Sequence, residues 1–338
     1  MTASNVVYGL AELELSADEK AFFRDVNPWG FILFARNVGD EKQLSRLTLS
    51  LRDCVGREAP IFIDQEGGRV ARLKPPIWRK APPAQVFGDL FLRDPEAAIE
   101  ATRINHQLLA HELRSVGVDV DCAPVLDLRI PGADAIIGDR AFGDTPDPIS
   151  VLGRAAMDGL MAGGVAPIIK HIPGHGRADA DSHLELPRVE EEHGLLSETD
   201  FAPFKALSDA PMAMTAHIVY ADIDPDNPAT TSADMIQRVI REEIGFEGLL
   251  MTDDLSMKAL SGTFRDRAEA SIKAGCDLLL HCNGDPSEMQ QIAESTTCFS
   301  DKALERALKA EASRDKIESF DPRSGESRLN SLLKQVQA

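Results

Sequence analysis

Val165-Ala166-Pro167-Ile168-Ile169-Lys170-His171-Ile172-Pro173-Gly174-His175-Gly176 is the stretch from which the fold can be worked out. Its first five residues are apolar, which is typical of a short buried strand. The proline and the two glycines that follow would not be tolerated in a helix. We therefore expect a strand that ends at Ile169, with Lys170 and His171 opening a polar loop at its carboxyl end.

Apolar runs of the same kind recur and alternate with helical patterns along the chain, which predicts a parallel sheet with helices outside it. The expected strands are Val6–Leu10, Gly30–Phe34, Pro60–Ile63, Val118–Cys122, Val165–Ile169, Met212–Thr215, Gly248–Met251 and Asp277–His281. Eight strand–helix units without a glycine-rich dinucleotide motif favour a (β/α)8 TIM-type barrel over a doubly wound sheet.

The helical patterns between these strands support the same architecture. We expect helices over the ranges 17–26, 41–54, 95–116, 150–162, 233–244 and 264–274, the first preceded by a capping box that begins at Ser16. The chain shows no internal repeat and no low-complexity linker, so we expect a single catalytic barrel domain over residues 1–338. A charged, helix-prone extension should occupy about residues 302–338.

The composition restricts the class of partner. The chain has 36 Lys and Arg against 55 Asp and Glu, and 36 − 55 gives a net charge of −19. This charge disfavours binding to nucleic acid or to an anionic membrane. No run approaches the length of a membrane span and the N-terminus lacks a signal-peptide pattern, so we expect a cytoplasmic protein. The five cysteines form no C-x-x-C pair and lie mostly in apolar runs, so we expect them to be buried free thiols. The partner should be a small molecule, and the composition does not indicate an oligomeric state.

Polar residues follow most of the expected strands, and in a barrel such residues surround one pocket at the carboxyl ends of the strands. They occur in the runs Asp64-Gln65-Glu66-Gly67-Gly68-Arg69, Ala123-Pro124-Val125-Leu126-Asp127, Ala216-His217, Thr252-Asp253-Asp254 and His281-Cys282-Asn283. Carboxylates accept hydrogen bonds from hydroxyl groups, and arginine donates them in a fixed fork. The set therefore suits a sugar ligand. Asp127 could equally hold a loop, and we leave it outside the predicted site.

Hydrolysis of a glycosidic bond with retention needs a carboxylate nucleophile and a proton donor. Asp253 is the candidate nucleophile, and Asp181 with His183 is the candidate proton donor. Histidine suits this role because its unperturbed pKa of about 6.5 lies close to neutral pH. Asp181, two residues earlier, could hydrogen-bond one ring nitrogen and fix the tautomer.

Three motifs together resemble the β-N-acetylglucosaminidases of glycoside hydrolase family 3, in the expected order over roughly residues 5–300. They are Lys170-His171-x-Pro173-Gly174-His175-Gly176 followed by Asp181-Ser182-His183, Asp64-Gln65-Glu66-Gly67-Gly68-Arg69-Val70, and Thr252-Asp253-Asp254-Leu255-Ser256-Met257. Most family members that act on glucosides carry a second domain and a carboxylate acid, and this chain has neither the length nor the pattern for them.

The resemblance implies a barrel that retains configuration, with Asp253 as nucleophile and His183 as general acid/base held by Asp181. It also implies removal of non-reducing-end N-acetylglucosamine from muropeptides during cell-wall recycling. Because Asp253 would manage the charge at the anomeric centre and His183 the protons, we expect no metal or cofactor. The sugar ligands implied by the motif positions are Asp64, Arg72, Arg140, Lys170 and His171.

Several alternatives remain open from the residues alone. The cluster His171, His175, Asp179, Asp181 and His183 could bind a metal, as in a metal-dependent barrel hydrolase of amide or ester bonds. A non-enzymatic sugar sensor would need neither Asp253 nor the Asp181–His183 pair.

Single residues also have a second interpretation. Lys170 could form a Schiff base, and Asp253 could cap a helix with Asp254 acting in its place. His175 could hydrogen-bond within its own loop, and Arg69 could form a structural ion pair.

Overall fold

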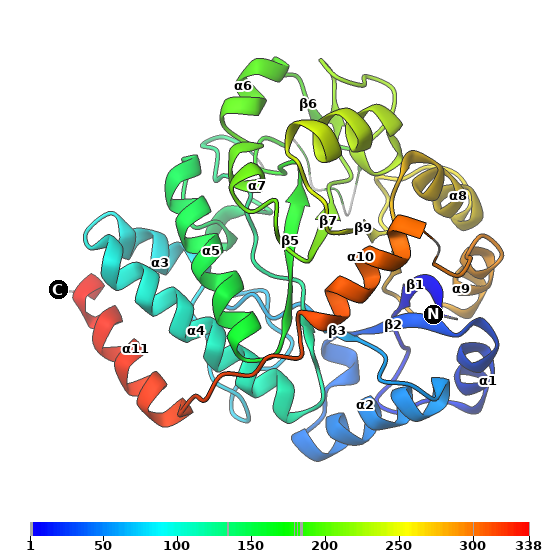
Figure 1. Cartoon of the computed structure of the whole chain (residues 1–338), viewed down its shortest axis with the longest axis horizontal. Coiled ribbons are helices and arrows are strands. Elements are labelled where there is room, and N and C mark those ends of the chain that lie inside the picture. Colours follow the sequence, from blue (N-terminus) through cyan, green and yellow to red (C-terminus); the bar gives the residue numbers. More distant parts are fainter. Residues whose placement is uncertain are drawn as a thin grey trace.

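The computed structural model describes residues 3–133, 135–178, 180, 182, 185–299 and 301–337, and these form a closed barrel with helices outside it (Figure 1). Eight parallel strands succeed one another around the barrel in chain order, and the last pairs with the first. The strands are β1 Ser4–Tyr8, β2 Pro28–Leu33, β3 Ile61–Ile63, β4 Val120–Asp121, β5 Ala166–Ile172, β7 Met212–Thr215, β9 Leu249–Asp254 and β10 Leu278–His281. The predicted (β/α)8 barrel is confirmed, and each expected strand is present.

Helices fill most of the connections between the strands. They are α1 Ala17–Val26, α2 Glu41–Val55, α3 Ala84–Phe91, α4 Pro95–Ser115, α5 Pro146–Ala162, α6 His193–Glu198, α7 Ala202–Ala206, η4 Met235–Glu243, α8 Phe264–Ala274, α9 Pro286–Ala293, α10 Asp301–Ala312 and α11 Pro322–Gln337, with short 3₁₀ turns η1 Ala35–Asn37, η2 Gly138–Arg140 and η3 Ala229–Thr231. The capping box at Ser16 is present, because Ser16 Oγ accepts the Glu19 N–H at 3.1 Å and Glu19 Oε2 accepts the Ser16 N–H at 2.9 Å. A small parallel pair, β6 Arg188–Val189 and β8 Val219–Tyr220, was not expected.

Strand β5 is longer than the sequence predicted. It continues three residues beyond Ile169, so Lys170 and His171 lie inside the strand and are only 2% and 7% exposed. These polar side chains are tolerated at this depth because each has a carboxylate partner, Asp64 for Lys170 and Asp127 for His171. The expectation that the strand ends at Ile169 was therefore wrong.

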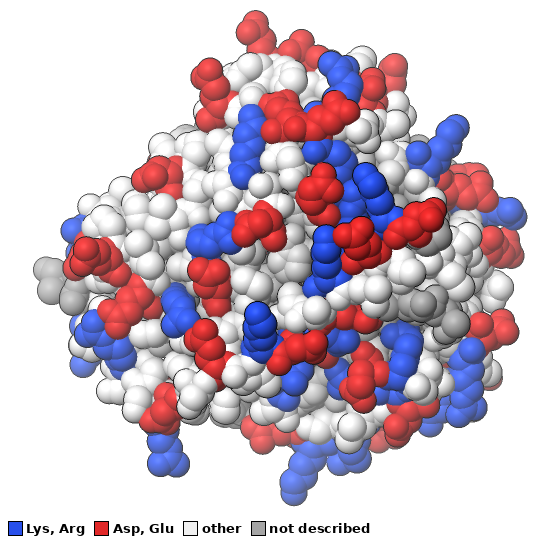
Figure 2. All heavy atoms as spheres, in the orientation of Figure 1, with Lys and Arg blue, Asp and Glu red and all other residues white. Residues whose placement is uncertain are grey.

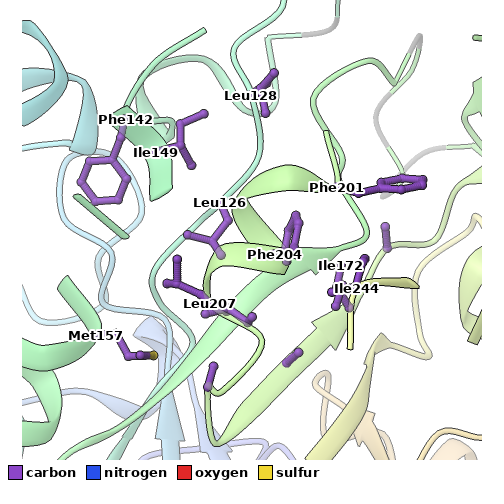
Figure 3. Close-up of a cluster of buried hydrophobic side chains, with 14 of the residues drawn as sticks. Leu126, Leu128, Phe142, Ile149, Met157, Ile172, Phe201, Phe204, Leu207 and Ile244 are labelled. Carbon is purple, nitrogen blue, oxygen red and sulfur yellow. The ribbon is translucent and has the colours of Figure 1, made fainter. Parts of the chain in front are cut away.

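The apolar core has an inner and an outer part. The inner part fills the barrel with side chains such as Ile32, Ile168 and Leu249. The outer part lies between the strands and the helices around them and includes Leu126, Ile172 and Phe204 (Figure 3). Successive residues of a strand thus alternate between the inner and the outer part of the core, as expected for strands buried on both faces.

The C-terminal extension closes the amino-terminal end of the barrel. Ala307 and Ala310 on α10 pack into the inner core, and Trp29 Nε1 donates a hydrogen bond to Glu311 Oε1 at 3.0 Å. Helix α11 lies alongside α4 (Figure 1) and buries Leu329 and Leu332 in the outer core. The extension is therefore part of the packed structure.

Surface features agree with the composition. Basic and acidic side chains are interspersed over the face in Figure 2. Within the described part of the chain, no helix is both long enough and apolar enough to cross a membrane. Cys54, Cys122, Cys276 and Cys282 are free thiols, as predicted, and the first three are buried. The expectation of burial was wrong for Cys298, which is exposed because it lies in the connection between α9 and α10.

Candidate active site

The carboxyl ends of the barrel strands enclose one polar cavity of about 190 Å³. It is lined by Ile32, Phe34, Asp64, Glu66, Arg69, Val70, Arg72, Ile136, Arg140, Lys170, His171, His175, Ser182, Met214, Asp253, Asp254, Met257, Leu280 and Cys282. The structure thus brings together all five predicted sugar ligands and the candidate nucleophile Asp253. The candidate proton-donor pair, Asp181 and His183, lies outside the described residues.

Five charged side chains form a continuous ionic chain along the wall of this cavity. Arg72 Nη2 donates to Asp64 Oδ2 at 3.0 Å, and Asp64 Oδ1 accepts from Lys170 Nζ at 2.9 Å. Lys170 Nζ also lies 2.7 Å from Glu66 Oε1. Glu66 in turn accepts from Nε and Nη2 of Arg140, each at 2.8 Å. The ionic chain fixes cationic donors and carboxylate acceptors of hydrogen bonds along the cavity wall, where they can contact a polar ligand.

The pKa values of these groups keep them charged. Burial would raise the pKa of Asp64, but Lys170 and then Arg72 hold it well below its usual value. Burial likewise opposes ionisation of Glu66, yet Lys170 and Arg140 lower its pKa to about 2. For Lys170 burial favours the neutral amine, and the charges of Asp64 and Glu66 reverse that preference and raise its pKa. A Schiff base requires a neutral amine, so this environment argues against that alternative.

An irregularity in β5 places two consecutive polar side chains in the cavity. In a regular strand Lys170 and His171 would point to opposite faces. The pairing register with β7 shifts between Lys170 and Ile172, and as a result both Lys170 and His171 line the cavity while Ile169 and Ile172 pack in the outer core. A shift of this kind cannot be predicted from alternation of residue types.

Two carboxylates, Glu66 and Asp127, are central to the site and were missed as site residues. Glu66 joins Lys170 to Arg140, as described above. Asp127 accepts the His171 Nδ1–H at 2.6 Å and the His175 backbone N–H at 2.7 Å. Burial would raise the pKa of Asp127, but His171 lowers it. Both residues lie in the polar runs that follow expected strands, the position that marked the predicted ligands, and that signal could have identified them as members of the site.

The adjacent carboxylates of β9 have different environments. Asp254 Oδ1 accepts the backbone N–H groups of Ser256 at 3.0 Å and Cys282 at 3.1 Å, and its Oδ2 accepts the Ser256 hydroxyl at 2.5 Å. Asp254 therefore braces the end of the strand. Asp253 is half-buried in the cavity wall, and its Oδ1 accepts the Asp254 N–H at 2.8 Å.

The turn that follows β5 is held at several points. Tyr220 Oη donates to the Gly174 carbonyl oxygen at 2.6 Å, and Arg177 Nε donates to Asp200 Oδ2 at 2.6 Å. His175 Nε2 lies 3.1 Å from Ser182 Oγ. Burial, followed by the proximity of His171, lowers the pKa of His175 to about 4, so the ring is neutral near neutral pH.

Two minor expectations can be compared with these contacts. Arg69 forms the expected ion pair, at 2.8 Å from Asp139. Three members of the suggested metal set, Asp179, Asp181 and His183, lie outside the described residues. Elsewhere in the described chain, no three His, Cys, Asp or Glu side chains are grouped so that they could hold a metal.

A barrel with a cavity of paired carboxylates, arginines and histidines at its carboxyl end is typical of a glycoside hydrolase, and comparison with known proteins agrees. Residues 6–311 match the model for the glycosyl hydrolase family 3 N-terminal domain. The chain belongs to glycosyl hydrolase family 3. The family resemblance seen in the sequence is thereby confirmed, and the protein is a glycoside hydrolase.

Individual relatives show how similar the chain is to family members. A protein of Bordetella parapertussis named Beta-hexosaminidase is 39% identical over 282 residues, which cover 82% of this chain and 79% of that protein. The crystal structure of native NagZ from Neisseria gonorrhoeae has a TM-score of 0.87 at 32% identity and covers 98% of both chains. The same Neisseria protein in complex with N-trifluoroacetyl-D-glucosamine has a TM-score of 0.85 at 31% identity, over 99% of this chain and 98% of that one.

Proposed function

We propose that the protein is a retaining exo-β-N-acetylglucosaminidase. In the first step Asp253 attacks the anomeric carbon while the glycosidic C–O bond breaks, and His183, held by Asp181, protonates the departing oxygen. In the second step His183 takes a proton from water, and the water oxygen displaces Asp253 from the anomeric carbon. The two steps return both residues to their starting protonation states.

The position of Asp253 in the cavity wall is the observation that carries the proposal. Asp254 braces the end of β9 through its hydrogen bonds to Ser256 and Cys282. Asp253 lies beside it in the cavity wall, in the same cavity as the ionic chain from Arg72 to Arg140. This geometry favours Asp253 as the group that reaches an anomeric carbon.

The ionic chain suits the hydroxyl groups of a sugar. We propose that Asp64, Arg72, Arg140, Lys170 and His171 bind the non-reducing-end residue. Each carboxylate retains lone pairs to accept hydroxyl protons, and each cation has donors to spare. The apolar side chains of Ile32, Met214 and Leu280 are buried in the inner core and also line the cavity, so they close its floor. A cavity closed at its floor supports an exo-acting enzyme, because it accommodates the end of a glycan.

The substrate and setting are proposed from the family. A Neisseria relative was crystallised with an N-acyl glucosamine, which supports an N-acetylglucosaminide as substrate. We propose that the natural substrates are peptidoglycan-derived muropeptides, that the enzyme acts in cytoplasmic cell-wall recycling, and that residues 1–338 work as one catalytic domain.

Hydrolysis of a nitrophenyl N-acetyl-β-glucosaminide by the dialysed protein in excess chelator tests this function. We expect full activity, because Asp253 and His183 carry out the chemistry without a metal. The chelator matters because a structure of the Neisseria relative was solved with a zinc ion. Activity that is lost in chelator and restored by zinc or manganese would favour a metal-dependent hydrolase. A protein that releases no nitrophenol in either condition would contradict the proposal.

A further inference from the structure

Asp127 occupies an unusual position for a carboxylate. Its neighbours Leu126 and Leu128 point into the outer apolar core (Figure 3). Asp127 has no exposed surface, and its Oδ atoms meet donors from β5 and from the turn that follows it. A buried carboxylate of this kind is stable only if its oxygens accept several hydrogen bonds.

The two oxygens of Asp127 serve two different segments. Oδ2 accepts the Nδ1–H of the His171 ring at 2.6 Å. Oδ1 accepts the backbone N–H of His175 at 2.7 Å and that of His171 at 3.2 Å. We call the first contact the ring arm and the second, with its continuation through His175, the turn arm.

The ring arm fixes how His171 faces a ligand. An ionised carboxylate only accepts hydrogen bonds, so the proton must lie on Nδ1 of His171. Nε2 is then the nitrogen left to meet a ligand in the cavity that His171 lines. A partner of this type commonly sets both the tautomer and the orientation of a histidine.

The turn arm continues from His175 to Ser182. The turn sits directly on the backbone beside Asp127, because a Cβ on Gly176 would lie 2.2 Å from the Leu128 carbonyl oxygen. His175 Nε2 lies 3.1 Å from Ser182 Oγ. Ser182 is 2% exposed and lines the cavity, and in the sequence it stands between Asp181 and His183.

We propose that Asp127 is a positioning residue that holds both halves of the active site. Its ring arm presents His171 to the sugar, and its turn arm holds Ser182 through His175. In the sequence, Ser182 lies between the two residues of the proposed acid/base pair. The proposal rests on the proposed glycosidase function. It predicts that the two arms affect different kinetic constants.

Asn and Ala at position 127 separate the arms. Asp127→Asn keeps an acceptor for the backbone N–H groups but places an NH₂ group opposite His171 Nδ1. We expect KM for an N-acetylglucosaminide to rise by about 10–100-fold, as for other histidine-orienting partners, with a smaller change in kcat. The inhibition constant of N-acetylglucosamine should rise by the same factor. Asp127→Ala removes both arms, and kcat should fall as well.

Ser182→Ala breaks only the end of the turn arm. We expect kcat on a disaccharide to fall by about 3–10-fold, the value of one hydrogen bond, with KM within about twofold of the wild type. The loss should be smaller on a nitrophenyl glycoside, whose leaving group departs without protonation. A role limited to stability would not distinguish between these leaving groups.

Asp119→Asn is the matched control. Asp119 is also a buried carboxylate that accepts a backbone N–H, from Ile61 at 2.8 Å, and an arginine, Arg52 at 3.0 Å. It precedes β4, at the end of the barrel opposite the cavity. This variant should lower the melting temperature and leave KM and kcat unchanged.

The outcomes separate this proposal from the function on which it rests. If the wild-type protein is active and the folded Asp127→Asn variant has an unchanged KM, the proposed role of the ring arm is wrong. If the wild-type protein is active and Ser182→Ala hydrolyses the disaccharide with an unchanged kcat, the proposed role of the turn arm is wrong. An inactive wild type would instead contradict the proposed function, and calorimetric binding of N-acetylglucosamine to wild type and Asp127→Asn would then decide whether the ring arm exists.

Discussion

At the scale of single residues, burial of charge explains the site better than residue type does. An unpaired Lys170 charge inside strand β5 would be strongly unfavourable, but Asp64 and Glu66, which follow β3, compensate it. The same pairing leaves these groups charged and fixed before a sugar arrives, so little reorganisation is needed on binding.

Arg72 tests whether this ionic chain binds the substrate. We expect Arg72→Met to reduce kcat/KM by about 10–100-fold, because a hydrogen bond from a charged donor is worth about 1.5–3 kcal/mol. Steady-state kinetics on a nitrophenyl N-acetylglucosaminide measures the effect. Arg154→Met is the control, since Arg154 forms a comparable pair with Asp209, at 3.0 Å, outside the cavity. Equal kinetics in the two variants would mean that the sugar binds elsewhere.

At the scale of elements, the sequence predicted the strands well and their ends less well. Apolar runs located all eight strands, because strands buried on both faces are nearly continuous apolar segments. The same reasoning stopped β5 at Ile169, since the ionic partners of Lys170 and His171 are distant in sequence. Short elements such as α6 and α7 carry too few residues for a periodic signal.

The members of the site were also easier to predict from the sequence than their contacts, because the contacting residues are distant in sequence. Motif positions gave Asp64, Lys170 and Asp253, which the structure places in one cavity. The sequence could have indicated that Glu66 and Asp127 belong to the site, but not that Glu66 pairs with Arg140 and Asp127 with His171, because these contacts form only in the folded chain.

Helix α10 provides a test of packing at the amino-terminal end of the barrel. Ala307 is fully buried, whereas the next residue, Leu308, is 51% exposed. We expect Ala307→Asp to lower the free energy of unfolding by about 3–5 kcal/mol, because it buries an unpaired charge. The same change at Leu308 should cost no more than about 0.5 kcal/mol. Urea unfolding compares the two, and similar losses would show that α10 does not close the barrel as described.

At the scale of the whole molecule, the barrel has two dissimilar ends. The carboxyl end holds the charged cavity, and the amino end is covered by the extension through α10. Substitutions around the cavity should therefore affect mainly activity, and substitutions beneath α10 should affect mainly stability. The buried histidines link the stability of the whole chain to pH.

His106 on α4 shows this link away from the strand ends. Its Nδ1–H donates to the Thr102 carbonyl oxygen at 2.8 Å, and burial lowers its pKa from 6.5 to about 4. Between these pH values the unfolded chain binds a proton that the folded chain does not, so acidification destabilises the fold. The loss should reach about 3 kcal/mol as pH falls from about 6.5 to about 4.

Comparison with His106→Gln isolates that contribution. The advantage of the wild type in free energy of unfolding should be constant above about pH 6.5 and shrink as the pH falls towards 4. Urea unfolding of both proteins across this range provides the measurement. Parallel pH dependences would show that His106 is not the group responsible.

The central claim, that Asp253 forms a covalent bond to the sugar, is tested most directly by trapping the intermediate. A 5-fluoro N-acetylglucosaminide with a good leaving group slows both steps, because fluorine destabilises the oxocarbenium-like transition state, and hydrolysis of the intermediate then limits turnover. Mass spectrometry of the digested protein should find one glycosyl group on the peptide with Asp253, mapped to that residue, and none in Asp253→Asn. A label on Asp254, or turnover with no label on either residue, would contradict the account.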